Sequence, residues 1–291
     1  MRMNRLKWCF SVMSVLTLLS LSMLSLQGCG EFKCEKDADC ASNATFADKG
    51  LKYCSTSRGV CVACTTNDHC GDGKVCSADS QTCADKKEEK PTEVTEPATK
   101  IKFLSSIKPH GGAPDQFLLG LGARVKVIIT VYALGFYLEP KPAADALKGF
   151  KGKKAADLEK DKTFYEALLK GEFGKSMRLV MAIDLDNETL NSAFDDSLEP
   201  RLKTEDGKKA LETFKGYFKE LLKEGDDIVF TWADKGTTLH VSIKGKHVGT
   251  IKNADFANAL LASYLDDDPA SPGAKKAFAA GLELLFQKAA Q

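Results

Sequence analysis

The sequence predicts an α+β domain, in which helices pack on one side of a mainly antiparallel sheet, preceded by a small disulfide-rich module. Eight cysteines lie between residues 34 and 83, and none follows them. From residue 101 onward, short runs rich in β-branched and aromatic residues recur between Gly, Asp and Pro, as is typical of strands. Helical patterns stand between these runs and after them, and this grouping favours the α+β class.

The chain has 291 residues, a formal net charge of +1 and a hydrophobic fraction of 43%. This length is sufficient for one or two globular units. Because acidic and basic residues are balanced and interspersed, there is no broad electrostatic reason for binding to nucleic acid or to an anionic membrane surface. We therefore expect no nucleic-acid partner.

Residues 1–28 have the order of a secretory signal peptide. Arg2, Arg5 and Lys7 form a basic start, and an apolar segment with small serines, "SVMSVLTLLSLSMLSL", follows. That segment is short for a membrane-spanning helix, which needs roughly 20 residues. A basic start, an apolar segment and small residues in this order are typical of a signal that is removed. The sequence therefore predicts an exported protein.

Leu26-Gln27-Gly28-Cys29 closes this segment and resembles a bacterial lipobox. The resemblance implies cleavage before Cys29 and a diacylglycerol thioether on its sulfur. Such a lipid would anchor the protein in the bacterial cell envelope, on the periplasmic or the outer-surface face. The alternative is an ordinary signal peptide with Cys29 as an unmodified thiol. Only the lipid anchor explains why a cysteine ends the segment, so we expect the membrane as a partner.

Residues 29–83 are expected to form a Cys-rich module of two repeats, each reading C-x5-C, a variable loop and C-x6-C. An even number of cysteines in an exported chain predicts disulfides. The segment also has too few large apolar side chains to fold by burial alone. The cysteines are Cys34, Cys40, Cys54, Cys61, Cys64, Cys70, Cys76 and Cys83. If each repeat closes on itself, three pairings are possible per repeat, and the sequence does not choose among them.

No metal site is expected in this module. Cys61-Val62-Ala63-Cys64 has the C-x-x-C spacing, but it is only the junction between the repeats. No second pair of this kind exists to complete a four-thiolate zinc site. The sequence does not identify a protein partner for the module.

The stretch 84–100 is charged, contains proline and lacks aromatic residues, so we expect a solvated linker. Residues 101–291 then form the main domain, which is long enough for one core. Its strand-like runs are "IKFLSSI", "FLLGLG", "RVKVIITVYALGFYLE", "MRLVMAI", "DIVFTW", "TTLHVSI" and "HVGTI". Lys235-Gly236 and Lys244-Gly245 supply turns between candidate antiparallel strands.

Three helices are predicted from apolar spacing and from capping residues. Thr204 caps a helix that is expected to continue to Gly225, with Leu and Phe side chains on one face. Asn253 caps the second helix. Ser271 caps the third and places Pro272 at its first position, where proline is favoured.

The motifs that would bind a cofactor are missing. The stretch that begins at Gly120 lacks the third glycine and the following helix of a dinucleotide fingerprint. There is no P-loop, G-x-S-x-G or H-E-x-x-H motif, so we expect no cofactor and no metal. His110, His240 and His247 are scattered along the sequence and are interpreted as structural or exposed. The three aspartates at 266–268 are interpreted as a solvated charge run.

"FLLGLGARV" followed by "VYALGFYLE" combines Gly-x-Gly-x-Arg with an aromatic strand that ends in Gly-x-Tyr-Leu. "EGDDIVFTWADKGTTLHVSIKGKHVGTIKNADFANALLASYLDDDPASP" adds hairpin strands, a Gly-x-Ile, an Asp-Phe that opens a helix, and a Pro past its end. In this order the features resemble the chalcone isomerase-like family, over nearly all of residues 101–291. The resemblance implies an open-faced β-sandwich, with helices layered against a large sheet and a cleft between them.

This family, as the resemblance implies, has two kinds of members. Plant enzymes close a chalcone to a flavanone by intramolecular attack of a phenolate, and relatives without that activity bind fatty acids. In both, the arginine at the position of Arg124 faces the cleft and meets an oxyanion. A guanidinium is planar, stays charged, and holds a carboxylate or phenolate through two parallel hydrogen bonds. The alternative for Arg124 is a structural pair with an acidic residue of the sheet.

Three further ligand-binding candidates come from the same resemblance. Tyr132 falls where fatty-acid-binding members place a carboxylate-contacting tyrosine, and Ser263 and Tyr264 fall where the enzymes place residues that select the phenol ring. The enzymes' further cleft tyrosine, which helps to orient the catalytic water, has no counterpart. From Arg124 to Tyr132 a straight strand spans about 26 Å, at ~3.3 Å per residue. The intervening "VKVIIT" contains no turn residue, so the sequence predicts no reversal that would bring the two side chains together.

Three functions are compatible with the sequence. The first is binding of an amphiphilic ligand, such as a fatty acid or a similar carboxylate, in an apolar cleft. The second is a chalcone isomerase-type intramolecular lyase acting on an enone-like substrate, with Arg124 as its catalytic residue. The third is a non-catalytic structural or interaction lipoprotein. A cleft of several hundred cubic ångströms with Arg124 at its base favours the first two, and a filled cleft favours the third.

Overall fold

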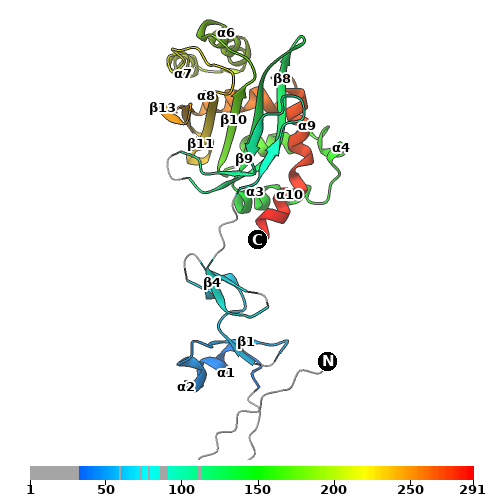
Figure 1. Cartoon of the computed structure of the whole chain (residues 1–291), viewed down its shortest axis with the longest axis vertical. Coiled ribbons are helices and arrows are strands. Elements are labelled where there is room, and N and C mark those ends of the chain that lie inside the picture. Colours follow the sequence, from blue (N-terminus) through cyan, green and yellow to red (C-terminus); the bar gives the residue numbers. More distant parts are fainter. Residues whose placement is uncertain (1–32, 59, 72–73, 78, 86–90, 111–112) are drawn as a thin grey trace, which may run out of the picture. The chain divides into compact units, whose positions relative to one another are not determined.

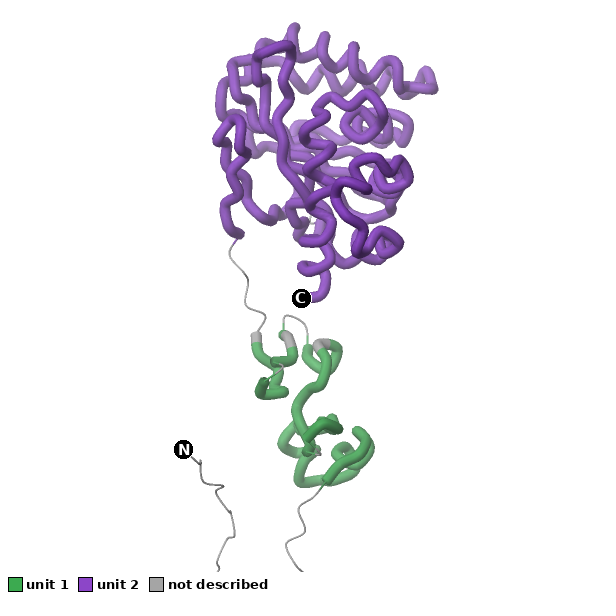
Figure 2. Tube along the Cα trace, turned by 90° about the vertical axis from the view of Figure 1, so that its right-hand side faces the viewer, with its two compact units in different colours: residues 1–88 green, residues 89–291 purple. Residues whose placement is uncertain are grey.

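The computed structural model describes residues 33–58, 60–71, 74–77, 79–85, 91–110 and 113–291. The chain divides into two compact units, residues 1–88 and residues 89–291, which have different colours in Figure 2. None of the helices in the described ranges has the length and apolar character needed to cross a bilayer.

The smaller unit is built from short helical segments and two antiparallel ribbons. Its elements are α1 (Asp37–Ala41), α2 (Ala44–Ala47), β1 (Tyr53–Ser55), β2 (Val60–Val62), the 3-10 turn η1 (Asn67–His69), β3 (Lys74–Cys76) and β4 (Cys83–Asp85). Strand β1 pairs with β2, and β3 pairs with β4. No element exceeds five residues, so crosslinks rather than a large core hold the unit.

Four disulfides supply those crosslinks and confirm the predicted framework. They join Cys34 to Cys54, Cys40 to Cys61, Cys64 to Cys76 and Cys70 to Cys83. In both repeats, therefore, the first cysteine bonds to the third and the second to the fourth, which is the choice that the sequence left open. The sulfurs also replace an apolar core, since Cys34, Cys40 and Cys54 form a buried cluster.

The larger unit contains a seven-stranded sheet in the order β13-β12-β11-β10-β9-β8-β7, and every neighbouring pair is antiparallel. The strands are β7 (Ser106–Ile107), β8 (Gln116–Lys126), β9 (Ile129–Leu138), β10 (Lys175–Met181), β11 (Asp227–Ala233), β12 (Thr238–Ile243) and β13 (Lys246–Lys252). The predicted α+β class with an antiparallel sheet is thus confirmed.

Helices cover the sheet in a second layer (Figure 1). They are α3 (Pro140–Leu147), α4 (Ala155–Leu158), α5 (Lys162–Lys170), α6 (Asn187–Leu198), α7 (Glu205–Lys215), α8 (Ala254–Leu265), α9 (Pro272–Ala280) and α10 (Leu282–Ala289), with 3-10 turns η2 (Lys148–Phe150), η3 (Glu199–Arg201) and η4 (Asp234–Gly236). Figure 1 shows α6 and α7 together at the end of the unit that the β8–β9 hairpin also reaches.

Strand β9 shows how the two faces of the sheet are used. Side chains alternate between faces along a strand, and Leu134 and Phe136 belong to the large core beneath the helices. Ala133 and Tyr137 belong instead to a smaller cluster on the other face, together with Phe103. Both faces of β9 are therefore covered, and this explains why its sequence is apolar throughout.

Phe103 lies in a two-stranded ribbon that replaces part of the expected linker. Strand β5 (Glu93–Thr95) pairs with β6 (Lys102–Leu104). Between the strands, the carboxylate of Glu96 is 4% exposed and accepts hydrogen bonds from the backbone N–H groups of Ala98 and Thr99 and from the Thr99 hydroxyl. The second half of the stretch 84–100 is mostly exposed to solvent, as expected, but it forms part of a hairpin rather than an extended linker, and the Glu96 carboxylate satisfies its turn.

The predicted caps of three helices are confirmed. The side chains of Thr204, Asn253 and Ser271 each accept a hydrogen bond from the N–H group three residues later. The helix that follows Thr204 is shorter than predicted, however, because α7 ends at Lys215 and Gly216 follows. The apolar residues beyond Gly216 leave the helix, and Leu222 forms a β-bridge with Leu185.

The prediction of a strand without a reversal over residues 124–139 is also wrong. The chain reverses at Val127-Ile128, so that β8 and β9 form a hairpin with a two-residue loop. As a result, Arg124 and Tyr132 become cross-strand partners. Val127 adopts φ +60° in this loop, a conformation that a glycine normally provides. The predicted turns at Lys235-Gly236 and Lys244-Gly245 are confirmed, with positive φ at all four residues.

Candidate functional site

A cavity of about 430 Å³ opens between the β8–β9 hairpin, strand β10, helix α6 and helix α8. The four residues that the sequence singled out for a ligand, Arg124, Tyr132, Ser263 and Tyr264, all line it. The remaining lining is mostly apolar and includes Leu179, Met181, Leu190, Phe194 and Leu260. This combination of an apolar chamber with a few convergent polar groups is typical of sites for small ligands.

Arg124 is positioned by the connection between α8 and α9. Its Nη1 donates to the carbonyl of Ala270 at 3.1 Å, and the next residue, Ser271, donates its hydroxyl to the carbonyl of Ala123 at 2.7 Å. These two hydrogen bonds join the connection to β8 at Arg124 and at the residue before it. Within the described residues Arg124 forms no ion pair with a carboxylate, so its half-buried positive charge is available to an anion.

Tyr132 and Tyr264 form the second polar element. Their hydroxyl oxygens lie 3.0 Å apart, and both side chains are buried. Burial raises the pKa of Tyr264 well above its ordinary value and also raises the pKa of Tyr132, while the positive charge of Arg124 acts in the opposite direction on both. Both phenols are therefore neutral at physiological pH. One proton joins the two oxygens, and the other hydroxyl proton has no acceptor among the described residues.

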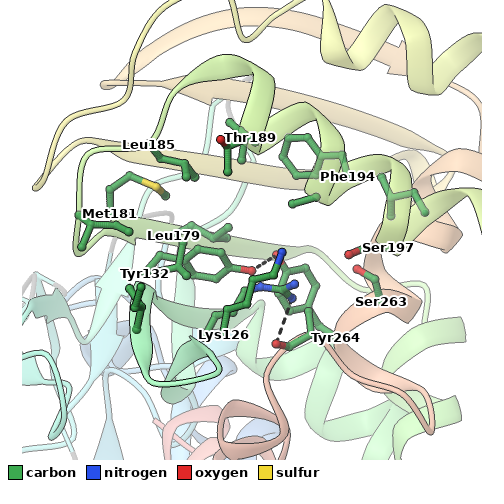
Figure 3. A pocket seen from close by; sticks show the side chains of 18 of the residues that line it. Lys126, Tyr132, Leu179, Met181, Leu185, Thr189, Phe194, Ser197, Ser263 and Tyr264 are labelled. Carbon is green, nitrogen blue, oxygen red and sulfur yellow. Dashed lines mark hydrogen bonds between the residues drawn. The ribbon is translucent and has the colours of Figure 1, made fainter.

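The hydroxyl of Ser263 has a local partner. It donates to the carbonyl of Leu260, one turn earlier in α8, at 2.8 Å. Ser263 thus contributes to the cavity wall, and its donor is already used by the helix backbone. Of the four candidates, Arg124, Tyr132 and Tyr264 interact with one another as one polar group. Figure 3 shows Ser263 in the wall of the same cavity as Tyr132 and Tyr264.

Helix α6 forms the opposite wall and was missed by the sequence analysis. Figure 3 shows Thr189 and Phe194 of this helix across the cavity from Tyr132 and Tyr264. A signal for it existed, because Asp186 accepts a hydrogen bond from the N–H of Thr189 as a cap. Leu190, Phe194 and Leu198 also recur every four residues on the buried face.

Two other sequence expectations change in the structure. Asp266 is not freely solvated, because Arg201 holds it through Nε at 2.7 Å and Nη2 at 3.0 Å. The histidines do not remain scattered either. The rings of His110 and His247 stack with centroids 4.1 Å apart, and the ring of His240 lies 5.7 Å from that of His247.

Neither histidines nor cysteines provide a metal site in the described part of the chain. The only groups of three potential ligands there with donor atoms within 4.8 Å of one another consist of cysteines. Those cysteines are engaged in disulfides and have no thiolate to offer. The lipidation candidate, Cys29, lies outside the described residues.

The fold and the site define a helix-backed antiparallel sheet that encloses an apolar chamber with one arginine and two phenols. Residues 98–285 match the family model described as chalcone-flavanone isomerase, and the chain belongs to this family. It is 28% identical over 200 residues to fatty-acid-binding protein 1 of Arabidopsis thaliana, covering 64% of this chain and 68% of that protein. It is also 29% identical over 206 residues to the chalcone–flavanone isomerase of Zea mays, covering 66% and 89%.

A solved structure supports the same fold. The crystal structure of a fatty-acid binding protein of Arabidopsis thaliana superimposes with a TM-score of 0.57 and 25% sequence identity. The match covers 67% of this chain and all of that one. Its extent agrees with the larger unit, residues 89–291.

Proposed function

We propose that the larger unit binds a fatty acid or a similar amphiphilic carboxylate in the cavity beside Arg124. The observation that carries this proposal is the placement of Arg124, Tyr132 and Tyr264 at one side of an otherwise apolar chamber of about 430 Å³. The acyl chain lies against the leucine, methionine and phenylalanine side chains of β10, α6 and α8. The relatives include proteins named for fatty-acid binding, and this supports a fatty acid as the class of ligand.

The carboxylate is held by charge and by hydrogen bonds together. The guanidinium of Arg124 supplies the positive charge and two parallel donors. The phenol whose proton is not used in the tyrosine pair donates a further hydrogen bond. In an apolar chamber such contacts are stronger than in water, although the desolvation of both charges opposes them.

The decisive experiment measures the affinity of the purified protein for a long-chain fatty acid and identifies, by native mass spectrometry, any lipid that co-purifies. Arg124→Ala should weaken binding by about 2–5 kcal/mol, the usual result of truncating one partner of a buried charge pair. Arg124→Lys should recover only part of that loss, because an ammonium cannot make the bidentate contact. Full affinity in Arg124→Ala would contradict the proposal.

Arg178→Ala is the matched control. Arg178 lies in strand β10 of the same sheet, is half-buried, and pairs through Nε with Asp227 at 2.8 Å, but it does not line the cavity. Its loss should lower the melting temperature and leave fatty-acid affinity unchanged. If both arginine variants lost affinity equally, the effect of Arg124 would be structural.

Chalcone isomerisation is the second candidate function, and membership of the chalcone-flavanone isomerase family favours it. The guanidinium that would hold a carboxylate could equally stabilise a phenolate. Because the further cleft tyrosine of the enzymes has no counterpart, we expect turnover to be absent or very slow. Turnover at the rate of a dedicated enzyme, abolished in Arg124→Ala, would reverse the order of the two functions.

We further propose that the protein is exported and anchored in the bacterial envelope through a lipid on Cys29. The basic and apolar start of the chain supports this, and so do the four disulfides, which are typical of exported proteins. Mass spectrometry of the protein extracted from membranes should find a chain that begins at Cys29 and carries a diacylglycerol on its sulfur, and Cys29→Ser should abolish this modification while both units remain folded. An unmodified Cys29 in the membrane-derived protein would exclude it as the anchor.

A further inference from the structure

The tip of the β8–β9 hairpin exposes an unusual group of large apolar side chains. Val127 is 92% exposed and Ile128 is 88% exposed, and Val125 and Ile129 beside them are 53% and 55% exposed. The other large apolar side chains that are exposed in the described chain are far from one another in the sequence. Scattered exposed apolar residues need no explanation, but a contiguous exposed group marks a contact surface.

The backbone of the tip is strained in order to present these side chains. Val127 is β-branched and adopts φ +60°, where such residues are outliers. A two-residue hairpin loop with positive φ at its first position normally has glycine there. The chain thus keeps valine at a position where glycine would suit the backbone better, and strain of this kind is concentrated at functional sites.

The tip is continuous with the cavity. Lys126, Val127, Ile128 and Ile129 form part of the cavity lining as well as the exposed loop. Figure 1 shows the hairpin and α6 reaching the same end of the larger unit, and residues of both line the cavity. An apolar molecule could therefore pass from the tip into the chamber without losing contact with apolar side chains.

We propose that this tip inserts into the lipid surface of a membrane, where the cavity exchanges its ligand. Val127 and Ile128 enter the acyl region, and the ammonium of Lys126 stays at the level of the phosphate groups, as long cationic side chains do. Insertion itself does not depend on the identity of the cargo, but its purpose, ligand exchange, rests on the proposed function.

A lipid surface fits the tip better than another protein does. A stable interface between two proteins involves roughly 20–30 residues on each side, and the tip offers four large side chains around two loop residues. A membrane accepts a small protruding wedge, because it needs no complementary pocket. The cation at the edge of the wedge complements the phosphates of a lipid surface.

The test uses flotation with vesicles of phosphatidylcholine alone and with added phosphatidylglycerol. It is done on a chain that begins at residue 30 and contains both units, so that neither a lipid on Cys29 nor the apolar segment before it can contribute. The variant Val127→Gly/Ile128→Asn supplies ordinary loop residues. We expect it to lose at least ten-fold in vesicle affinity while its melting temperature stays the same or rises. Equal vesicle affinity of parent and variant, or no binding of the parent to either vesicle, would overturn the proposal.

Two controls distinguish membrane insertion from a lid and from a dimer contact. Leu284→Ser removes an apolar side chain of α10 that is 52% exposed, and it should leave vesicle binding unchanged.

An Ile128→Trp probe should show a blue-shifted emission with vesicles. A shift of the same size with a soluble fatty acid and none with vesicles would make the tip a lid over the ligand. A dimer in solution that Val127→Gly/Ile128→Asn abolishes would make a second copy the occupant. Both results contradict insertion.

The failure of this inference is distinguishable from failure of the proposed function. If Arg124→Ala loses fatty-acid binding and still floats with phosphatidylcholine vesicles, both proposals stand. If the parent binds fatty acid from solution but never floats, only insertion is wrong. If it floats but binds no fatty acid, insertion stands and the cargo is wrong.

Discussion

Arg124 and Tyr132 lie directly opposite each other on β8 and β9, although they are eight positions apart in the sequence. The reversal at Val127-Ile128 creates this pairing. It brings the charge of the arginine close enough to influence the pKa of Tyr132. The polar end of the cavity thus depends on the geometry of one hairpin.

Removing one hydroxyl of the tyrosine pair should weaken both binding and folding. Tyr132→Phe keeps the ring and removes a hydrogen bond, so we expect a loss of about 1 kcal/mol in fatty-acid affinity. Because the Tyr264 hydroxyl would lose its buried partner, the free energy of unfolding should also fall by about 1 kcal/mol. Replacing both tyrosines by phenylalanine should restore most of the stability but not the affinity. A double-mutant cycle using denaturation and titration checks this, and full affinity in the double variant would show that neither phenol touches the ligand.

Filling the cavity from α6 should exclude long ligands. Ala193 lines the chamber, so Ala193→Phe places a ring where the acyl chain is proposed to lie. Affinity should fall at least ten-fold for a long-chain fatty acid and less for a short one. Ser192→Phe is the control, because Ser192 is exposed and is not part of the lining. Equal effects of both substitutions on a series of chain lengths would place the ligand elsewhere.

Reduction should unfold the smaller unit alone. All four disulfides lie between Cys34 and Cys83, and the larger unit contains no cysteine. Each disulfide typically stabilises a fold by about 2–4 kcal/mol, and the smaller unit has little apolar core to replace that contribution. Limited proteolysis after treatment with a reductant should therefore remove the smaller unit and leave a resistant fragment that begins near residue 91. Loss of this fragment at the same reductant concentration would mean that the units depend on each other.

The histidine cluster should make the larger unit less stable in mild acid. Burial lowers the pKa of both His240 and His247, and the nearby charge of His110 lowers them further. Asp234 opposes the shift of His240 and the Val241 backbone opposes that of His247, without reversing either. The unfolded chain, with histidine pKa values of about 6.5, then binds more protons than the folded chain. The free energy of unfolding should consequently fall as the pH drops below that value.

Melting temperatures at pH 7.5 and 5.0 measure this effect. His247→Gln should reduce the difference between the two temperatures, because it removes one of the groups that resists protonation. His69→Gln is the control, since His69 belongs to the smaller unit and stacks on Tyr53. An unchanged difference in His247→Gln would exclude the cluster as the source.

Local signals in the sequence were sufficient for the parts of the fold that have local causes. The caps at Thr204, Asn253 and Ser271 and the glycine-containing turns were predicted because each depends on one or two side chains. The reversal at Val127-Ile128 has no such signal. The pairing of β8 with β9 and with the rest of the sheet determines it, against the preference of the loop residues.

The end of α7 and the histidine cluster have similarly distant causes. Leu222 leaves the helical pattern because it pairs with Leu185, which lies far from it in the sequence. The three histidines are brought together by adjacent strands and a loop, and their spacing along the chain does not indicate this. Most site residues were found through the family resemblance, whereas α6 was overlooked although its cap and its apolar spacing were visible.

The interlaced disulfides also limit how far the chain between Cys34 and Cys83 can be stretched. Without them, this segment could extend to about 170 Å, at ~3.4 Å per residue. With them, the shortest covalent route through a repeat crosses six residues and one disulfide, whose Cα atoms are 5.6 Å apart. Through two such routes and the junction between the repeats, the greatest distance from Cys34 to Cys83 is about 60 Å. If Cys29 carries a lipid, the oxidised module is a short tether that keeps the larger unit near the bilayer. Reduction of the disulfides would roughly triple the distance that residues 34–83 can span.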